Sequence, residues 1–225
     1  ILVTPVVTIG SGCLVGFLIG PPISGFMSWL GSLINWGTEQ QPFLMGILVS
    51  VFVGIALTLP ISSAAICAAL GLTGLAGGAA VAGCCAQMVG FAVMSFRENK
   101  WGGLVSQGIG TSMLQMGNIV KNPRIWIAPI LTSAITGPLA TCLFKLQMNG
   151  TPVSSGMGTC GFVGQIGVYT GWMNDIADGL KTSVTGWDWA GLLMISFILP
   201  AILCPLINMF IRKLGWVKDG DMTLS

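Results

Sequence analysis

The chain has 225 residues, of which 53% are hydrophobic and only 7% are charged. Soluble domains carry about 25% charged residues, and a chain with so few ionisable groups could not cover a surface that faces water. The composition therefore excludes an ordinary soluble domain and predicts an integral membrane protein. The formal net charge of +2 is small and the basic residues are scattered, so we expect no nucleic-acid partner.

The chain contains no histidine and seven cysteines, and no two cysteines form a C-x-x-C pair. The absence of histidine excludes a phosphohistidine, a histidine general base and imidazole ligation of a metal within these residues. The cysteines fall in apolar stretches, which predicts small buried side chains rather than zinc ligands. We therefore expect no metal site, no cofactor and no catalytic residue.

A membrane-spanning helix needs about 20 mostly apolar residues. Stretches of this kind predict spans, and shorter, glycine-rich or more polar stretches between them predict re-entrant hairpins, broken helices or interfacial helices. The predicted spans are 1–20, 42–59, 78–96, 125–144 and 189–211. The irregular segments are 23–37, 61–75, 102–120 and 146–174. The predicted fold is thus an all-α polytopic membrane protein with about five or more transmembrane helices.

We expect a single domain over residues 1–225. The chain begins at Ile1, without an initiator methionine and without the basic region and cleavage site of a signal peptide. We therefore expect that an N-terminal part precedes it.

Two proline-serine motifs follow apolar stretches, Pro22-Ile23-Ser24 and Pro60-Ile61-Ser62. Proline removes a backbone donor from a helix, and serine can satisfy the backbone groups that proline frees. We therefore expect the helix to break at both motifs.

Glu39 is the first charged residue of the chain and lies between apolar segments. A loop position at the headgroup boundary is the interpretation we favour. The alternative is a carboxylate that projects into the bundle, where it would be a candidate substrate-binding group.

Segment 102–120 carries Gln107, Thr111 and Gln115 at intervals of four residues, followed by Asn118. On a continuous helix the first three would share one face. Such a segment is either an interfacial amphipathic helix or a half-helix that lines a cavity. In the second case, Gln107, Gln115 and Asn118 would contact the substrate.

Residues 154–167 read Ser-Ser-Gly-Met-Gly-Thr-Cys-Gly-Phe-Val-Gly-Gln-Ile-Gly. Irregular backbone at membrane depth persists only where it is buried in protein or lines a polar cavity. We predict a re-entrant hairpin whose tip faces a central site; a tightly packed hairpin without a ligand is the alternative. The candidate substrate-binding residues of this segment are Ser154, Ser155, Gly156, Gly158, Thr159, Gly161 and Gln165.

The chemistry of this segment suits a neutral, polyhydroxylated ligand such as a sugar. Sugar hydroxyls donate and accept hydrogen bonds, and amides, hydroxyls and bare backbone match them without burying a charge in lipid. The same segment matches the dinucleotide pattern G-x-G-x-x-G at residues 156–161. No hydrophobic strand or βαβ unit accompanies this match, so we reject a dinucleotide site.

The basic residues give the chain an orientation, because cytoplasmic loops collect lysine and arginine. The group expected inside consists of Arg97, Lys100, Lys121, Arg124, Arg212, Lys213 and Lys218. Lys145 and Lys181 are expected outside. This pattern places the two ends of the glycine-rich hairpin on the outer face.

Several of these stretches resemble the IIC-type membrane proteins of the bacterial phosphotransferase system, and the most similar branch is the PfoR-type, named after a perfringolysin regulator. The resemblance rests on residues 155–167, 20–24, 60–65 and 118–123. It implies a multi-pass permease of the bacterial inner membrane, commonly a homodimer, that moves a carbohydrate inward through the lipid bilayer. It also implies a separate IIB phosphocarrier that docks on the cytoplasmic face.

Several better-known sugar IIC proteins place a histidine near the sugar, and this chain has none, which leaves coupled phosphorylation open. We expect the chain not to be a catalyst by itself, although it could form part of a sugar phosphotransferase complex. Two alternatives to a sugar permease stay open: a membrane-embedded regulator or sensor, and a small-solute transporter that is independent of phosphotransfer.

Overall fold

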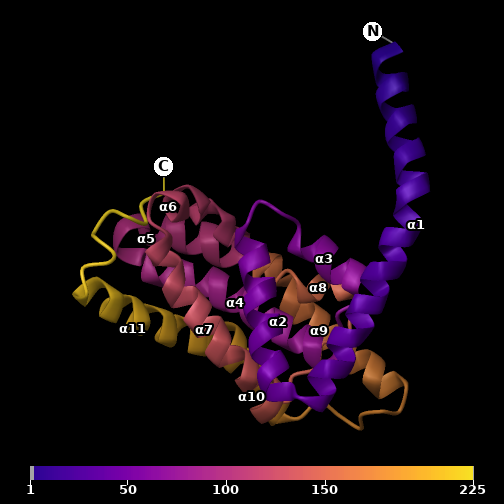
Figure 1. The fold of residues 1–225 in the computed structure, drawn as a ribbon. Helices are drawn as coiled ribbons and strands as arrows, with labels where there is room; N and C mark the ends of the chain where they lie inside the picture. The colour runs from indigo at the N-terminus through magenta and orange to yellow at the C-terminus, as the bar shows by residue number, and fades with distance from the viewer. Residues whose placement is uncertain (1–2, 225) are drawn as a thin grey trace.

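The computed structural model describes the backbone of residues 3–224 and the side chains of residues 21, 22 and 24–224. Within this part the chain is helical, and a single antiparallel β-bridge joins Gly74 to Met148. The α-helices (Figure 1) are α1 Val3–Gln40, α2 Pro42–Thr58, α3 Ser63–Leu70, α4 Gly74–Met94, α5 Phe96–Val105, α6 Met116–Lys121, α7 Ile127–Pro138, α8 Pro152–Ser155, α9 Val163–Ala177, α10 Gly186–Leu193 and α11 Leu199–Lys213.

Short π- and 3-10-helical turns extend or join several of these helices. The π-helical turns are Ser106–Gly110 after α5, Leu139–Leu143 after α7 and Met194–Ile198 between α10 and α11. The 3-10 turns are Ser112–Gln115, Pro123–Trp126 and Cys160–Phe162. A π-turn leaves backbone groups out of the regular helical ladder and is often found at functional sites.

Three continuous helical stretches of the described residues are long and apolar enough to cross a membrane. They are Gly74–Met94, Pro123–Leu143 and Gly186–Lys213, and they match the predicted spans 78–96, 125–144 and 189–211. The predicted span 42–59 corresponds to α2, an apolar helix of 17 residues. Residues 3–20 of the predicted span 1–20 belong to α1, and the side chains of this span lie outside the described residues. The chain is therefore an all-α membrane protein.

Helix α4 is the centre of the bundle and packs against α2, α7 and α11. Its sequence is rich in Gly, Ala and Cys, because neighbouring backbones approach it closely. A Cβ atom on Gly83 would lie 1.8 Å from the carbonyl oxygen of Ser50 in α2, and one on Gly78 would lie 1.8 Å from that of Leu146. Only glycine allows these contacts. Glycine also brings α2 and α7 together, since a Cβ on Gly137 would lie 2.3 Å from the Gly46 oxygen.

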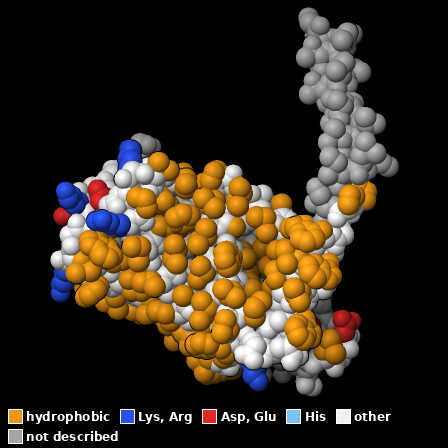
Figure 2. Space-filling model, in the orientation of Figure 1, with side chains coloured by type: hydrophobic (Ala, Val, Ile, Leu, Met, Phe, Trp, Pro, Cys, Tyr) orange, Lys and Arg blue, Asp and Glu red, His pale blue; other side chains and the backbone are white. Residues whose placement is uncertain are grey.

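Large apolar side chains cover the sides of the bundle, as the orange face in Figure 2 shows. Phe26, Trp29, Phe43, Phe52 and Trp101 are each more than half exposed. An apolar surface of this extent would cause a protein to associate in water, whereas lipid tails accept it. Charged side chains gather at the left of this view, and only isolated ones lie at the bottom and the lower right.

The predicted helix break at Pro22-Ile23-Ser24 is wrong. Helix α1 continues through Pro21 and Pro22, so the segment predicted separately as 23–37 belongs to one helix of 38 residues. The physical reason is that lipid supplies no hydrogen-bond partners, which makes opening the backbone more costly there than keeping a helix with prolines in it.

The second predicted break, at Pro60-Ile61-Ser62, is present. Helix α2 ends at Thr58, and Ser62 caps α3 by accepting the backbone N–H of Ala65 at 3.2 Å. The next residue, Ser63, donates its hydroxyl to the carbonyl of Gly156 at 2.7 Å. The irregular backbone of the glycine-rich segment thus receives a hydrogen bond from this break.

Segment 102–120 is not one continuous helix, although the prediction that its polar side chains share one face required such a helix. Helix α5 runs into the π-turn Ser106–Gly110, the chain reverses at Thr111, and it returns through a 3-10 turn and α6. Glycines at 108 and 110 and the extended conformation of Thr111 end the helix there. We call residues 96–121 the amide hairpin.

Candidate functional site

The glycine-rich segment is a hairpin that reaches the middle of α4. Residues 149–177, which we call the glycine hairpin, enter through α8, turn at 156–162 and leave through α9. Gly158 has φ +52°, and a Cβ atom on it would lie 2.6 Å from the Cβ of Cys84, halfway along α4. The tip is therefore pressed against the central helix, and glycine is required there by both backbone conformation and contact.

The limbs of the glycine hairpin also depend on close approach. A Cβ on Gly167 would lie 2.4 Å from the Cβ of Ser154, and one on Gly171 would lie 2.7 Å from the backbone nitrogen of Asn149. Gly161 has φ +52° as well, but only Val163 lies within 4 Å of its Cβ position. Glycine is required at position 161 by the positive φ of the turn and not by close packing.

The hydroxyl groups predicted to bind substrate are buried and engaged with protein partners. Ser155 donates to the carbonyl of Pro152 at 2.7 Å, and Ser154 shares a hydrogen bond of 3.0 Å with Thr151. Thr159 is completely buried and donates to the carbonyl of Gly108 at 2.6 Å. In this state the hairpin is closed around its own polar groups.

The contact between Thr159 and Gly108 joins the tips of the two hairpins. Gly108 lies in the π-turn of the amide hairpin, and the Thr159 hydroxyl also lies 3.6 Å from the sulfur of Met88 in α4. Two irregular segments that are about fifty residues apart in the chain therefore meet beside the central helix. The sequence identified both segments, but it gave no sign that they touch.

Gln165 contributes a second polar group at this level of α4. Its side-chain nitrogen lies 3.3 Å from the sulfur of Cys85, and its side-chain oxygen has no hydrogen-bond partner although it is buried. A buried polar atom without a partner costs about 1–3 kcal/mol. The Gln165 oxygen is thus an acceptor available to a ligand or a water molecule.

Gln87 is a functional candidate that the sequence analysis missed. Its side-chain oxygen accepts from the indole N–H of Trp126 at 2.9 Å and from Thr58 at 3.3 Å, while its nitrogen is buried without a partner. Thr58 also contacts the hydroxyl of Ser112, at 2.9 Å, in the amide hairpin. Its position in the sequence could have identified Gln87 as a candidate. Gln87 is the only long polar side chain in α4, and such a residue in a membrane-spanning helix is a candidate site residue.

The amides predicted in segment 102–120 do come together, although not through helical spacing. Gln115 donates to the side-chain oxygen of Gln107 at 2.9 Å, and Asn118 donates to that of Gln115 at 2.8 Å. Gln107 in turn donates to the Ser95 hydroxyl at 2.9 Å. The chain reversal at Thr111 produces this row, with Gln107 on one limb and the other two amides on the other.

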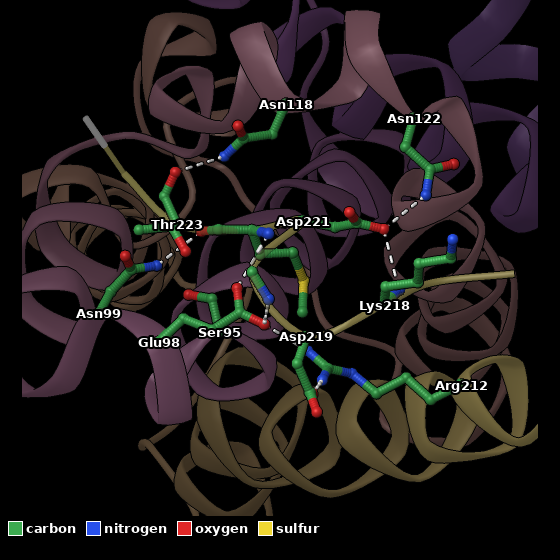
Figure 3. Close-up of polar contacts among 12 residues, drawn as sticks. Ser95, Glu98, Asn99, Asn118, Asn122, Arg212, Lys218, Asp219, Asp221 and Thr223 are labelled. Atoms are coloured by element: carbon green, nitrogen blue, oxygen red, sulfur yellow. Dashed lines mark hydrogen bonds and ion pairs between the residues drawn. The ribbon is translucent and has the colours of Figure 1, made fainter. Parts of the chain in front are cut away.

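Residues 214–224 follow the last helix and cross over this amide row; we call them the C-terminal strap. Gln115 donates to the carbonyl of Met222 at 3.0 Å. Asn118 donates to the carbonyl of Thr223 at 3.0 Å (Figure 3). Asn99 donates to the Met222 carbonyl at 2.8 Å and accepts the Leu224 N–H at 2.8 Å. The side chain of Met222 is fully buried, so the strap closes this end of the bundle.

Glu98 anchors the strap from the start of the amide hairpin (Figure 3). Its carboxylate accepts from the Arg212 guanidinium at 2.7 Å and from the backbone N–H groups of Met222 and Gly220 at 2.9 and 3.3 Å. Arg212 also pairs with the exposed carboxylate of Asp219. These are charge-assisted hydrogen bonds, the stronger class.

Asp221 makes a second anchor. Its carboxylate accepts the backbone N–H of Lys218 at 2.9 Å and the side-chain N–H of Asn122 at 2.8 Å. These bonds lower the pKa of Asp221, with the Lys218 backbone contact as the larger cause. Because the pKa of Asp221 is lower in the folded protein than in the unfolded chain, these bonds stabilise the folded state at pH values above the ordinary carboxyl pKa. This stabilisation is lost as the pH falls through the lowered pKa of Asp221.

Glu39 lies apart from these groups. It is exposed in the last turn of α1 and makes no hydrogen bond or ion pair with any other candidate residue in the described part of the chain. Within the described residues, no three His, Cys, Asp or Glu side chains are grouped in a way that could hold a metal ion.

Irregular hairpins that meet inside a bundle of apolar helices are typical of membrane proteins that transport solutes, because broken helices expose backbone groups to a central site. A family model described as "Phosphotransferase system, EIIC" matches residues 1–224. The chain belongs to this family. No curated protein and no solved structure matches it. Membership makes the chain a membrane component of sugar transport that works with a sugar substrate and a IIB component.

Proposed function

We propose that this chain is a multi-pass permease of the bacterial inner membrane that moves a sugar inward through a site between the two hairpin tips. The contact of 2.6 Å between the Thr159 hydroxyl and the Gly108 carbonyl carries this proposal, because it joins two irregular segments beside the middle of α4. Backbone of this kind at membrane depth needs a protein-lined or polar environment.

The groups around the tips have the chemistry that a neutral sugar requires. Thr159 supplies a hydroxyl and Gln165 an unpaired acceptor, and both groups are buried. Gln87, whose buried side-chain nitrogen is unpaired, lies on another side of α4 and is linked to the amide hairpin through Thr58 and Ser112. A sugar hydroxyl can replace Gly108 as the partner of Thr159 and can pair with the free side-chain atoms of the two glutamines, because each sugar hydroxyl both donates and accepts. In this proposal, sugar binding separates Thr159 from Gly108.

The C-terminal strap lies at the end of the bundle that the distribution of basic residues predicts to be cytoplasmic. A sugar that leaves in this direction has to pass the amide row, so Gln107, Gln115 and Asn118 would contact it only after the strap moves. The IIB component would dock on the same face. We further propose that the chain belongs to the PfoR-type branch and works as a homodimer.

Sugar binding to the purified protein tests the proposed site. Thr159→Val and Gln165→Ala should each weaken binding at least tenfold, which corresponds to about 1.4 kcal/mol, the scale of one lost hydrogen bond. Thr170→Val is a matched control, because Thr170 lies exposed on the same helix as Gln165 and bonds only to the Ile166 carbonyl. Unchanged binding in both site variants, or no binding of any saccharide, would refute the site.

Two further measurements separate the alternatives. Uptake of the sugar in cells that lack the general phosphotransferase proteins would favour a transporter independent of phosphotransfer. Sugar binding without uptake, in cells that contain these proteins and the IIB component, would favour a membrane-embedded regulator or sensor.

A further inference from the structure

A polar cavity of about 160 Å³ lies at the Gly74 end of α4, opposite the C-terminal strap. We call it the polar pocket. Its walls come from the loop before α8, the end of α9 and the segment that leads into α10. The lining residues are Phe144, Lys145, Leu146, Gln147, Asn149, Trp172, Asp175, Leu180, Lys181 and Asp188. At about 30 Å³ for each water molecule, the pocket accepts several waters or one small solute.

The charges of the pocket cancel. Lys145 and Lys181 line it together with Asp175 and Asp188, and Lys181 pairs with Asp188 at 2.7 Å. A site for an anion would require an excess of positive charge, and a site for a cation would require an excess of carboxylates. The balance of two against two therefore favours a neutral ligand.

One wall of the pocket is aromatic. Trp172 packs edge-on against Trp189, with ring centroids 5.4 Å apart, and the Lys181 ammonium lies 5.3 Å from the Trp172 ring centre. Phe144 lies beside Trp187 at 5.1 Å. Aromatic rings supply rigid apolar contact, and the C–H faces of a sugar ring can take the place of the lysine side chain over such a surface.

The polar groups of the pocket have unused hydrogen-bonding capacity. Both oxygens of Asp175 accept from the Asn149 amide, at 3.0 and 2.9 Å, and an ionised carboxylate has about four acceptor positions. Lys145 makes no ion pair within the described residues, and its φ of +46° is an uncommon conformation for a side-chain-bearing residue. Such strain is often found at ligand sites.

The pocket is connected directly to the glycine hairpin. Asn149 accepts the backbone N–H of Gly74, the first residue of α4, at 3.2 Å. Its side-chain nitrogen also donates to Asp175, and this contact links the two limbs of the hairpin. A ligand that bonds to Asp175 or Asn149 therefore touches the end of the hairpin whose tip lies at Thr159.

We infer that the polar pocket is a first binding position for a neutral polyhydroxylated solute, which a sugar occupies before it reaches the hairpin tips. This inference rests on the proposed function, since it names an earlier position on the same path. Asp175 and Asn149 bind the hydroxyls, and Trp172 provides the apolar face once Lys181 moves aside.

Protection of a cysteine from alkylation tests the pocket. Gln147→Cys, in a background that carries Cys142→Ser, places a thiol on the exposed rim of the pocket. The purified protein is first assayed for binding of D-glucose, D-mannitol and N-acetyl-D-glucosamine, and the sugar that binds most tightly is the probe. This sugar should slow alkylation of the thiol by a membrane-impermeant maleimide severalfold.

Three variants of this protein decide the outcome. Asp175→Asn should abolish the protection, whereas Asp178→Asn should not, because Asp178 is exposed one turn further along and does not line the pocket. Thr159→Val, which weakens the site at the tips, should leave the protection intact.

Persistence of the protection in Asp175→Asn would overturn the inference. The inference would also be overturned if Thr159→Val lost sugar binding and no variant showed protection. The proposed function would stand in that case. If none of the three sugars binds the protein at all, both the inference and the proposed function fail.

Discussion

Side-chain amides form many of the hydrogen bonds that hold the C-terminal strap at its end of the bundle. Asn99, Gln115 and Asn118 each donate to a main-chain carbonyl of the strap, which has no regular secondary structure of its own. An amide offers both donors and an acceptor, so it can satisfy an irregular backbone without adding a charge. The strap is therefore held mostly by uncharged groups, and Glu98 supplies a charged acceptor for two of its backbone N–H groups.

Glu98→Gln should loosen the strap. The substitution keeps the size of the side chain but removes the charge that faces Arg212 and two backbone N–H groups. A hydrogen bond to a charged group contributes about 2 kcal/mol, so the population with a detached strap should rise about 30-fold. Trypsin cleavage after Lys218, followed by mass spectrometry, measures this population.

Asp219→Asn is the control for this experiment, since Asp219 pairs with the same arginine but its side chain is 93% exposed. An exposed ion pair contributes little, so cleavage should hardly change. Equal cleavage rates in the wild-type protein and in Glu98→Gln would show that Glu98 does not anchor the strap.

The sequence located polar residues better than it located their partners. Residue type and spacing identified Thr159, Gln107 and Gln115, because polar side chains are conspicuous in an apolar chain. The contacts of these residues could not be predicted, since Gln115 meets the Met222 carbonyl across 107 positions and the strap has no periodic pattern. Whether these side chains bind a sugar stays a prediction.

At the scale of helices, hydrophobicity predicted where the spans lie but not which helices break. Spans 78–96, 125–144 and 189–211 correspond to helices because a long apolar run has few alternatives in lipid. The helix breaks at Pro60 but continues through Pro22, although both motifs have the sequence Pro-Ile-Ser. The difference lies in tertiary contacts, since Ser63, just after Pro60, bonds to the glycine hairpin.

Gly83→Ala should destabilise the bundle. The new methyl group would lie 1.8 Å from the Ser50 carbonyl, so α2 would have to move away from α4. Overpacking of this kind costs about 1–3 kcal/mol or more. The thermal unfolding midpoint of the purified protein should fall by several degrees.

Gly25→Ala provides the comparison for this substitution. Gly25 is an exposed position of α1 with nothing within 4 Å of its Cβ position, so its replacement should leave the midpoint unchanged or raise it. If both variants unfold at the same temperature, close packing at Gly83 is not what holds α2 to α4.

For the molecule as a whole, the two groups of basic residues lie at opposite ends of α4. Arg212 pairs with Glu98 just beyond Met94, whereas Lys145 and Lys181 line the polar pocket near Gly74. The bias of lysine and arginine predicts that the end with the strap faces the cytoplasm. A polar pocket toward the outside and a closed strap toward the inside would then make this a state that accepts solute from outside.

Labelling from opposite sides of the membrane tests this orientation. Lys218→Cys should react with a membrane-impermeant maleimide only in inverted vesicles, and Lys145→Cys only in right-side-out vesicles, both in the Cys142→Ser background. Each variant is the control for the other. Reaction of Lys145→Cys in inverted vesicles alone would reverse the predicted orientation.

The C-terminal strap also constrains the order in which the protein is assembled. Met222 and Glu98 are 124 positions apart, and the strap follows every described helix in the chain. During synthesis, the carboxylate of Glu98 and the row of amides emerge from the ribosome long before the residues that cover them. Until then, water or a chaperone has to occupy this face, so the nascent protein passes through a stage in which its helices are inserted and one end is still unsealed.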